Sequence, residues 1–204
     1  MGPMVTPPPT YTASEYLAND FWKKKISYFF DFLDVDKNGF LAQDDKDRSL
    51  VLTLAQIKKP LTEADLASFN IGYDEAWTFY GFKGIPLSKR DMIQHMADKC
   101  GTSGIAEYLE KIGNRWFGLL DEDGDEEVSW VEFCNMHKGA GRNWEEDAKL
   151  SFEAIDTDGD GHISKQEWTN MVWGFFMGLD PTSPSRFMWN NFDKLQATTV
   201  VPVY

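Results

Sequence analysis

Acidic side chains recur at alternate positions in three twelve-residue loops, and these residues are the best suited in the sequence to chemistry. The clearest loop, 156–167, carries carboxylates at its first, third, fifth and twelfth positions and glycine at its sixth. A calcium ion takes six to eight oxygen ligands, and this spacing directs alternate side chains toward one point. The glycine allows the positive φ of the sharp bend. The predicted Ca²⁺ ligands are Asp156, Asp158, Asp160, the backbone carbonyl of His162, and Glu167.

A second loop, 34–45, follows the same pattern but ends in aspartate rather than glutamate. Because aspartate is one methylene shorter, Asp45 reaches a central ion less easily with both oxygens, which lowers the coordination number. Six-coordinate Mg²⁺ tolerates that change better than Ca²⁺ does. We therefore predict a mixed calcium and magnesium site. Its predicted ligands are Asp34, Asp36, Asn38, the backbone carbonyl of Phe40, and Asp45.

The third loop, 121–132, has all the acidic residues but places Glu126 where the bend glycine belongs. Holding a non-glycine residue at positive φ costs on the order of 1 kcal/mol, which is small beside the attraction of four acidic ligands for a divalent ion. We predict an ion site of reduced affinity. Its predicted ligands are Asp121, Asp123, Asp125, Glu127 and Glu132. A single acidic run is more often a solvated loop, but three such loops between helical segments favour ion binding.

The spacing of apolar residues predicts helices on both sides of every loop, and so an all-α fold. A Pro-rich leader over 1–13 precedes two pairs of helix-loop-helix units, over 14–100 and 105–178, joined by a short linker at 101–104 and followed by a tail over 179–204. Because the linker is so short, we expect two paired lobes in one compact body. The expected helices cover about 13–33, after a capping box at Thr12–Glu15, and about 44–58, 62–80, 88–100, 105–120, 129–137, 143–155 and 164–177.

The unit between the first and third loops keeps the helices but loses the ligands. If Leu87 takes the apolar eighth position, the loop runs over 80–91, with aromatic residues and glycine where carboxylates are required. We predict that this loop binds no ion and that the chain binds three. The formal net charge is −13, and three divalent ions would offset six of those negative charges.

The charge, hydropathy and cysteine content of the sequence limit the classes of binding partner and the cellular compartment that we expect. A net charge of −13 repels nucleic acid and anionic lipid, so we expect neither nucleic-acid binding nor stable membrane association. No apolar run is long enough for a membrane span, and the N-terminus lacks the pattern of a secretory signal. Cys100 and Cys134 lack zinc spacing and are too few for a disulfide framework, which predicts reduced thiols. We expect a cytoplasmic monomer.

With its three acidic loops, the degenerate second loop, Asp45 and the segment 175–184, the sequence resembles the sarcoplasmic calcium-binding proteins and calexcitins of the EF-hand family. The resemblance covers about residues 14–193. It implies four EF-hand units with paired aromatic faces, no catalysis, and a role as a cytosolic calcium and magnesium buffer. We take this buffer role as the main functional prediction from the sequence.

The sequence is also similar to the coelenterazine-dependent photoproteins, which implies a first alternative: a calcium-regulated carrier of a small apolar ligand, or a photoprotein with monooxygenase-type activity. Jellyfish photoproteins hold their substrate with histidines, including one in the last helix, whereas the matching stretch 171–176 has none. His95, His137 and His162 lie elsewhere. Comb-jelly photoproteins lack that histidine and end in tyrosine, as this chain does at Tyr204. The aromatic residues that could line a cavity are Trp22, Trp77, Trp116, Trp173, Phe176 and Trp189.

A second alternative is a calcium sensor that opens a groove for a target helix. Such grooves are typically lined by methionine, whereas Phe and Trp dominate the apolar positions here. Other enzyme classes find no support, since phosphate-binding glycine loops, nucleophile elbows and zinc-ligand clusters are missing from the sequence.

Overall fold

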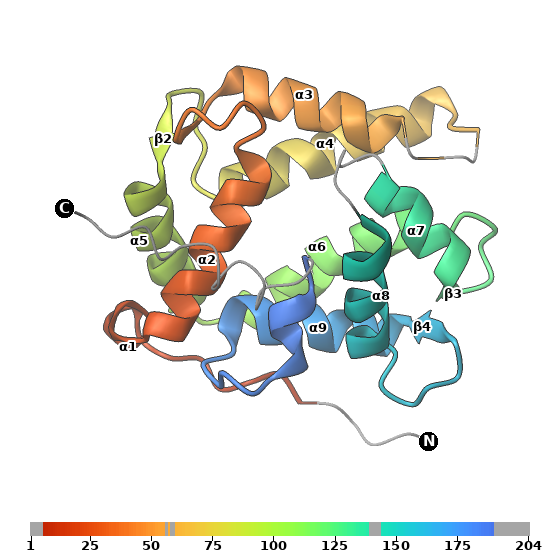
Figure 1. Ribbon diagram of the computed structural model, residues 1–204. Coiled ribbons are helices and arrows are strands. Elements are labelled where there is room, and N and C mark those ends of the chain that lie inside the picture. The colour runs from red at the N-terminus through yellow and green to blue at the C-terminus, as the bar shows by residue number, and fades with distance from the viewer. Residues whose placement is uncertain (1–5, 56, 58–59, 139–143, 190–204) are drawn as a thin grey trace.

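Helix-loop-helix units make up the part of the chain that the computed structural model describes, residues 6–55, 57, 60–138 and 144–189. The helices are α1 (Ala13–Ala18), α2 (Asp20–Leu33), α3 (Gln43–Leu54), α4 (Glu63–Phe79), α5 (Lys89–Cys100), α6 (Ile105–Leu120), α7 (Trp130–Lys138), α8 (Trp144–Ile155) and α9 (Lys165–Met177). The strands are β1 (Phe40–Leu41), β2 (Leu87–Ser88), β3 (Glu127–Ser129) and β4 (His162–Ser164), and a 3₁₀ turn, η1, spans Pro184–Phe187. In Figure 1 the helices α1 to α5 lie to the left and along the top, and α6 to α9 run through the middle to the right and bottom. The predicted all-α fold is confirmed.

Short antiparallel strands join the loops in two pairs. Leu41 of the first loop faces Leu87 of the second, and Val128 of the third faces Ile163 of the fourth. Each of these residues stands at the eighth position of its loop, and three of them, all except Leu87, are fully buried. These side chains thus anchor the first, third and fourth loops on the core, next to the buried acidic residues that close those loops.

The first predicted helix is divided into two helices, α1 and α2, in the structure. The sequence predicted a continuous helix from about residue 13 to 33, but α1 ends at Ala18 and α2 begins at Asp20. Asn19 has an extended backbone, with φ −90° and ψ 108°, and its side-chain oxygen accepts a hydrogen bond from the Trp22 N–H at 2.8 Å. Asparagine favours this N-cap geometry over helix interior, so the apolar periodicity continues across a break in the backbone.

A single aromatic core connects the two halves of the chain. Phe29 of α2 lies 4.8 Å from Tyr80 and 5.6 Å from Phe176 of α9, measured between ring centroids, and Phe79 lies 5.9 Å from Phe176. Because these rings come from both pairs of units, the pairs share one core rather than two separate ones. Cys100 and Cys134 are both buried. None of the described helices has the length and hydropathy needed to cross a membrane.

The same core contains a buried cation. Lys25 is 0% exposed, and its ammonium group donates hydrogen bonds to the backbone carbonyls of Gly174, at 2.9 Å, and Gly178, at 2.7 Å. Burial in this apolar surrounding lowers the pKa of Lys25 to about 7, because removal from water disfavours the charged form.

The lowered pKa predicts a measurable dependence of stability on pH. Between pH 7 and pH 9 the unfolded chain holds a proton on Lys25 that the folded chain has largely released, so the free energy of unfolding should rise with pH, by up to about 1 kcal/mol per pH unit. The Lys25→Met variant should lack this rise. Urea unfolding of both proteins at pH 7, 8 and 9, at fixed free Ca²⁺, measures the difference. Parallel pH profiles for the two proteins would contradict the assignment.

Candidate metal sites

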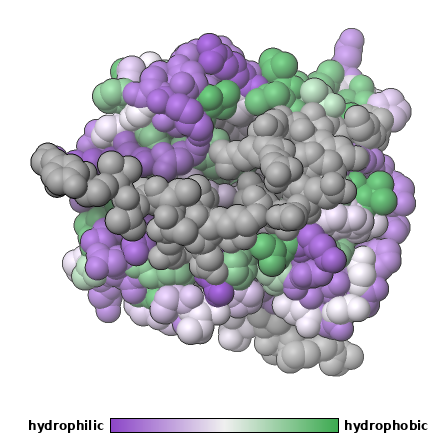
Figure 2. Space-filling view, viewed as in Figure 1, coloured by the Kyte–Doolittle hydropathy of each residue, from purple (hydrophilic) through white to green (hydrophobic). Residues whose placement is uncertain are grey.

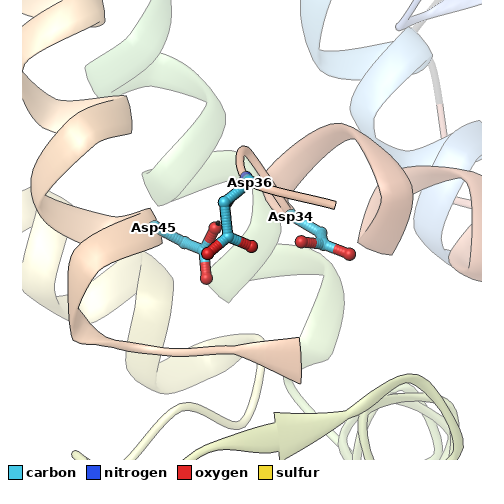
Figure 3. Close-up of side chains that lie close together, drawn as sticks. All are labelled: Asp34, Asp36 and Asp45. Atoms are coloured by element: carbon cyan, nitrogen blue, oxygen red, sulfur yellow. Dashed lines mark hydrogen bonds between the residues drawn. The ribbon is translucent and has the colours of Figure 1, made fainter. Parts of the chain in front are cut away.

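The structure gathers three carboxylates in each of the three acidic loops. The clusters are Asp34, Asp36 and Asp45; Asp121, Asp123 and Glu132; and Asp156, Asp158 and Glu167. In each cluster, one oxygen from every residue lies within 4.8 Å of the others. Figure 3 shows Asp34, Asp36 and Asp45 directed toward one another from the end of α2, the loop and the start of α3. Converging carboxylate oxygens are the donor set that Ca²⁺ prefers, so the residues present fit this ion.

The twelfth residue of each loop closes the cluster by bonding to both ends of its own loop. Glu167 accepts from the Thr157 N–H at 2.7 Å and from the Ser164 N–H at 2.9 Å. Glu132 and Asp45 make the equivalent pairs of bonds to the second and ninth positions of their loops. Since this residue also lies in the first turn of the following helix, closing the loop fixes the direction of that helix.

These bonds also set the charge of the closing residues. Burial acts to raise the pKa of Glu167, but hydrogen bonds from Ser164 and Thr157 outweigh it and hold the pKa below its ordinary value. Burial also acts to raise the pKa of Glu132, but hydrogen bonds from Ser129 and from the loop backbone outweigh it and hold that pKa below its ordinary value. Both carboxylates are therefore ionised at neutral pH, as metal ligands must be.

The first-position residues are held in the same manner. Asp34 accepts from the Gly39 N–H at 3.0 Å, and Asp156 accepts from the Gly161 N–H at 3.0 Å. The fifth-position carboxylates Asp125 and Asp160 do not belong to the clusters of the described structure. The fifth-position side chains Asn38, Asp125 and Asp160 each accept from the backbone N–H of the seventh position at 2.9–3.0 Å. The structure thus brings together the first, third and twelfth positions. The fifth-position ligands and the seventh-position carbonyls of Phe40, Glu127 and His162 stay predictions.

Glu126 occupies the strained position that the sequence indicated. Its φ is +70°, in the region where the glycines of the other two loops lie, Gly39 at +88° and Gly161 at +90°. The third loop therefore reaches the same bend as its neighbours, but with a side chain that disfavours it.

Replacing this residue should strengthen the third loop. We expect Glu126→Gly to raise the free energy of unfolding of the calcium-loaded protein by about 1 kcal/mol, because glycine adopts this φ without strain. Glu126→Ala is the matched control, since it removes the same charge but keeps the Cβ atom. Urea unfolding should show a gain for glycine alone; equal effects of glycine and alanine would mean that charge, not backbone strain, limits this loop.

In the second loop, 80–91, buried aromatic side chains, a hydrogen bond and an ion pair stand where the other loops have a carboxylate cluster. Tyr80 and Phe82 are buried in the core, and the Asp91 carboxylate accepts from the Ser88 hydroxyl at 2.7 Å, which caps α5. Lys89 forms an ion pair with Asp31 at 2.6 Å. Among the described residues, no acidic trio forms in this loop. Its strand pairing with the first loop survives without an ion.

The six aromatic residues proposed for a cavity have different environments. Trp22, Trp77, Trp173 and Phe176 are buried, and the indole N–H groups of Trp22 and Trp173 donate to backbone carbonyls of α9 and α6. Trp189 stacks on Phe29 at 5.4 Å. Trp116 lines a half-open cleft of about 400 Å³ between α4 and α6. Tyr204 and the rest of the tail from 190 onward, residues 1–5 of the leader, and the side chain of His137 lie outside the described residues.

Comparison with known proteins places this geometry among calcium-binding folds. A model of the EF hand matches residues 149–172. Obelin from Obelia geniculata is 26% identical over 191 residues, covering 83% of this chain and 94% of obelin. The calcium-regulated photoprotein mitrocomin from the jellyfish Mitrocoma cellularia has the same fold, with a TM-score of 0.72 at 19% identity over 90% of this chain and 94% of its own. The coelenterazine-binding protein from Renilla muelleri, in its calcium-loaded apo form, gives a TM-score of 0.60 at 19% identity over 86% and 96%.

These comparisons correct the main functional prediction. The resemblance to sarcoplasmic calcium-binding proteins and calexcitins predicted a cytosolic buffer, but the relatives are a calcium-regulated photoprotein, a coelenterazine-binding protein and obelin. The buffer role is wrong. Calcium binding and the EF-hand architecture are confirmed, and the more distant resemblance, to coelenterazine-dependent photoproteins, is the one with support.

Proposed function

We propose that this chain is a calcium-regulated binding protein for a coelenterazine-type molecule, in which calcium controls the retention or the oxidation of that ligand. The observation that carries the proposal is the similarity to obelin, which extends over 94% of obelin. Three carboxylate clusters on the helices that build the aromatic core provide the means of regulation.

We infer that the ligand combines aromatic rings with polar groups. The aromatic side chains of the core come from both halves of the chain. The described residues also include buried polar atoms without a hydrogen-bond partner, the Trp189 indole N–H in contact with Phe29 and the Asn114 side-chain oxygen at the cleft between α4 and α6. Buried polar groups usually have partners, and each one without a partner carries a free-energy cost. A ligand with hydroxyl or amide groups would satisfy such atoms, as a purely apolar one would not.

The helices that bear the ion loops also bear the aromatic residues. α2 carries Phe29 and ends immediately before Asp34. α9 has Glu167 in its first turn and carries Phe176 near its end. An ion that draws the loop carboxylates together would fix both helices, and with them the rings of the core. Because α9 has no histidine between Met171 and Phe176, we assign the chain to ligand binding first and to light emission second.

A target-binding sensor is less well supported by the geometry. The five methionines whose side chains the structure describes, Met92, Met96, Met171, Met177 and Met188, are all buried. On the coloured part of the face drawn in Figure 2, hydrophobic residues lie among hydrophilic ones. Neither feature resembles a methionine-lined groove.

The first loop should select between two ions. Asp45 is fully buried at the twelfth position, and Ala42 at the ninth lacks the hydroxyl that Ser129 and Ser164 provide in the other loops. We expect Asp45→Glu to raise the preference of this loop for Ca²⁺ over Mg²⁺ by roughly tenfold, because the longer side chain supplies two oxygens. Calcium titrations with and without millimolar Mg²⁺ measure the change, and Asp44→Glu, one residue away and exposed, is the control. An unchanged ratio would contradict the role of Asp45.

Reconstitution tests the function itself. Calcium-free protein is incubated with coelenterazine and passed through a desalting column, and the eluted protein is assayed for bound ligand and for light after calcium is added. Stoichiometric co-elution that changes with calcium supports the proposal; release without light indicates a carrier, and light indicates a photoprotein. A variant with Glu132→Gln and Glu167→Gln together should bind ligand but lose most of the calcium response. No co-elution of ligand with the unmodified chain would contradict the proposal.

We further propose that the chain acts as a monomer in the cytoplasm. The net charge of −13 supports the monomeric state, since repulsion between like-charged chains opposes their association. Sedimentation velocity of the loaded protein tests the oligomeric state.

A further inference from the structure

Three side chains at the start of α2 reach the C-terminal end of α9. Asn19 is the N-cap of α2, and Trp22 and Lys25 lie three residues apart within the helix, which makes their side chains neighbours on its surface. The Trp22 indole N–H donates to the Phe176 carbonyl at 2.7 Å, and Lys25 donates to the carbonyls of Gly174 and Gly178. The Asn19 amide makes a longer bond, 3.4 Å, to the Leu179 carbonyl. We call these three residues the α2 clamp.

The clamp gives donors to carbonyl groups at the end of α9. The last four carbonyls of an α-helix have no intrahelical donor. Trp22 and Lys25 supply donors to two of them, those of Phe176 and Gly178, and Lys25 also bonds to the Gly174 carbonyl. Trp22 and Lys25 are both 0% exposed, so water cannot replace them. The rings of Phe21 and Phe175, at 4.9 and 5.6 Å from the Lys25 nitrogen, enclose the ammonium group. The junction is therefore a fixed, desolvated contact.

The end of α9 has little room to move against its surroundings. A Cβ atom at Gly174 would lie 2.7 Å from the Cβ of Ser185, which shows how closely η1 packs against this turn. The Gly178 N–H donates to the Gly174 carbonyl at 3.1 Å, so one carbonyl serves both the end of α9 and Lys25. A displacement of α9 along its axis would thus reach the α2 clamp.

Each of the two joined helices carries an ion loop at its far end. α2 ends at Leu33, immediately before Asp34, and Glu167 lies in the first turn of α9. The two loops belong to different strand pairs, so no strand of the described structure connects loop 34–45 with loop 156–167. The α2 clamp is a direct hydrogen-bonded contact between the helices of these loops.

We propose that Asn19, Trp22 and Lys25 are positioning residues that couple ion binding in loop 156–167 to ion binding in loop 34–45. An ion held by Glu167 fixes α9, the clamp transmits that position to α2, and α2 sets where Asp34 lies relative to Asp36 and Asp45. By linkage, an ion in the first loop strengthens the fourth by the same factor. The proposal rests on the calcium regulation proposed above.

A double-mutant cycle tests the coupling. In a Glu132→Gln background, which silences the third loop, calorimetric calcium titration reports loops 34–45 and 156–167 alone. Adding Glu167→Gln should lower the Ca²⁺ affinity of loop 34–45 by about tenfold when the clamp is intact. In Lys25→Met protein, where methionine keeps most of the side-chain length but not the donor, the same change should lower it less than about twofold.

Lys23→Met is the matched control, because Lys23 lies on the same helix but is partly exposed and forms an ion pair with Asp20. It should preserve the tenfold effect. If Lys25→Met fails to fold, Trp22→Phe removes a single donor and should weaken the coupling in part. Equal effects of Glu167→Gln with and without the clamp, or no effect in either, would overturn the proposal. Absence of calcium binding in the unmodified chain would instead contradict the proposed function, and the stoichiometry of the same titration shows which has failed.

Discussion

Replacing Glu167 by glutamine is expected to remove one calcium ion from each molecule. Glu167 is the closing residue of loop 156–167, and its two oxygens accept hydrogen bonds from both ends of that loop. Glutamine keeps one oxygen and loses the negative charge, so the ion loses its bidentate ligand. At free calcium a thousand times the dissociation constant, an intact site adds about 4 kcal/mol to the free energy of unfolding, and the variant should lose most of it.

Asp91→Asn is the control for this experiment. Asp91 holds the twelfth position of loop 80–91, but its carboxylate accepts from the hydroxyl of Ser88, the N-cap of α5, and belongs to no acidic cluster of the described structure. Calcium stoichiometry by calorimetry should fall by one ion in Glu167→Gln and stay constant in Asp91→Asn. If the first variant keeps its full stoichiometry, the assignment of loop 156–167 is wrong; if the second loses an ion, loop 80–91 is an ion site after all.

The ion loops could be predicted because all their chemistry is local. Ligands at the first, third and twelfth positions lie within one twelve-residue segment, so spacing alone places their oxygens together. The same reasoning identified the strained residue Glu126, which the structure holds at a φ of +70°. It also gave Leu87 as the eighth residue of the second loop, and this residue pairs with Leu41. Each of these inferences needed only the spacing of residues within one loop and the expectation that the loops pair.

Features that depend on contacts distant in sequence escaped prediction. The apolar residues of α1 and α2 keep one helical period on both sides of Asn19, so only the backbone conformation of Asn19 reveals the break between the two helices. Lys25 follows two other lysines, Lys23 and Lys24, and nothing in that run distinguishes the one that is fully buried. Its partners lie about 150 positions later in the sequence. A charged residue at a position facing the core of an amphipathic helix was the one available signal.

The function was misjudged for a related reason. Acidic loops report which ion binds, but they are the same in a buffer and in a protein whose ion controls a ligand. The difference lies in the aromatic interior, which is assembled from α2, α4, α9 and the segment after η1. Helical spacing predicts that such rings are buried and does not predict whether they enclose a ligand.

Phe29 lies where those elements meet, and its replacement by alanine should have the second large effect. It is 1% exposed, and its ring lies within 4.8–6.0 Å of Tyr80, Trp189, Phe176 and Phe175. Removing a buried phenyl ring costs about 3–5 kcal/mol, from lost burial and from the cavity left behind. We expect Phe29→Ala to lose that stability in urea unfolding and to lose ligand retention after coelenterazine reconstitution.

Phe40→Ala separates the role of the core from that of the first ion loop. The Phe40 side chain is 48% exposed, and its backbone carbonyl, the predicted ligand, is unchanged by the substitution. This variant should stay within about 0.5 kcal/mol of the original chain and retain ligand. Because Phe29→Ala leaves every loop carboxylate in place, its calcium stoichiometry should also be unchanged once it is folded. A loss of ligand with full ion binding would show that the aromatic core and the ion loops act as separate parts joined through α2. Ligand retention equal to that of Phe40→Ala would place the ligand away from Phe29.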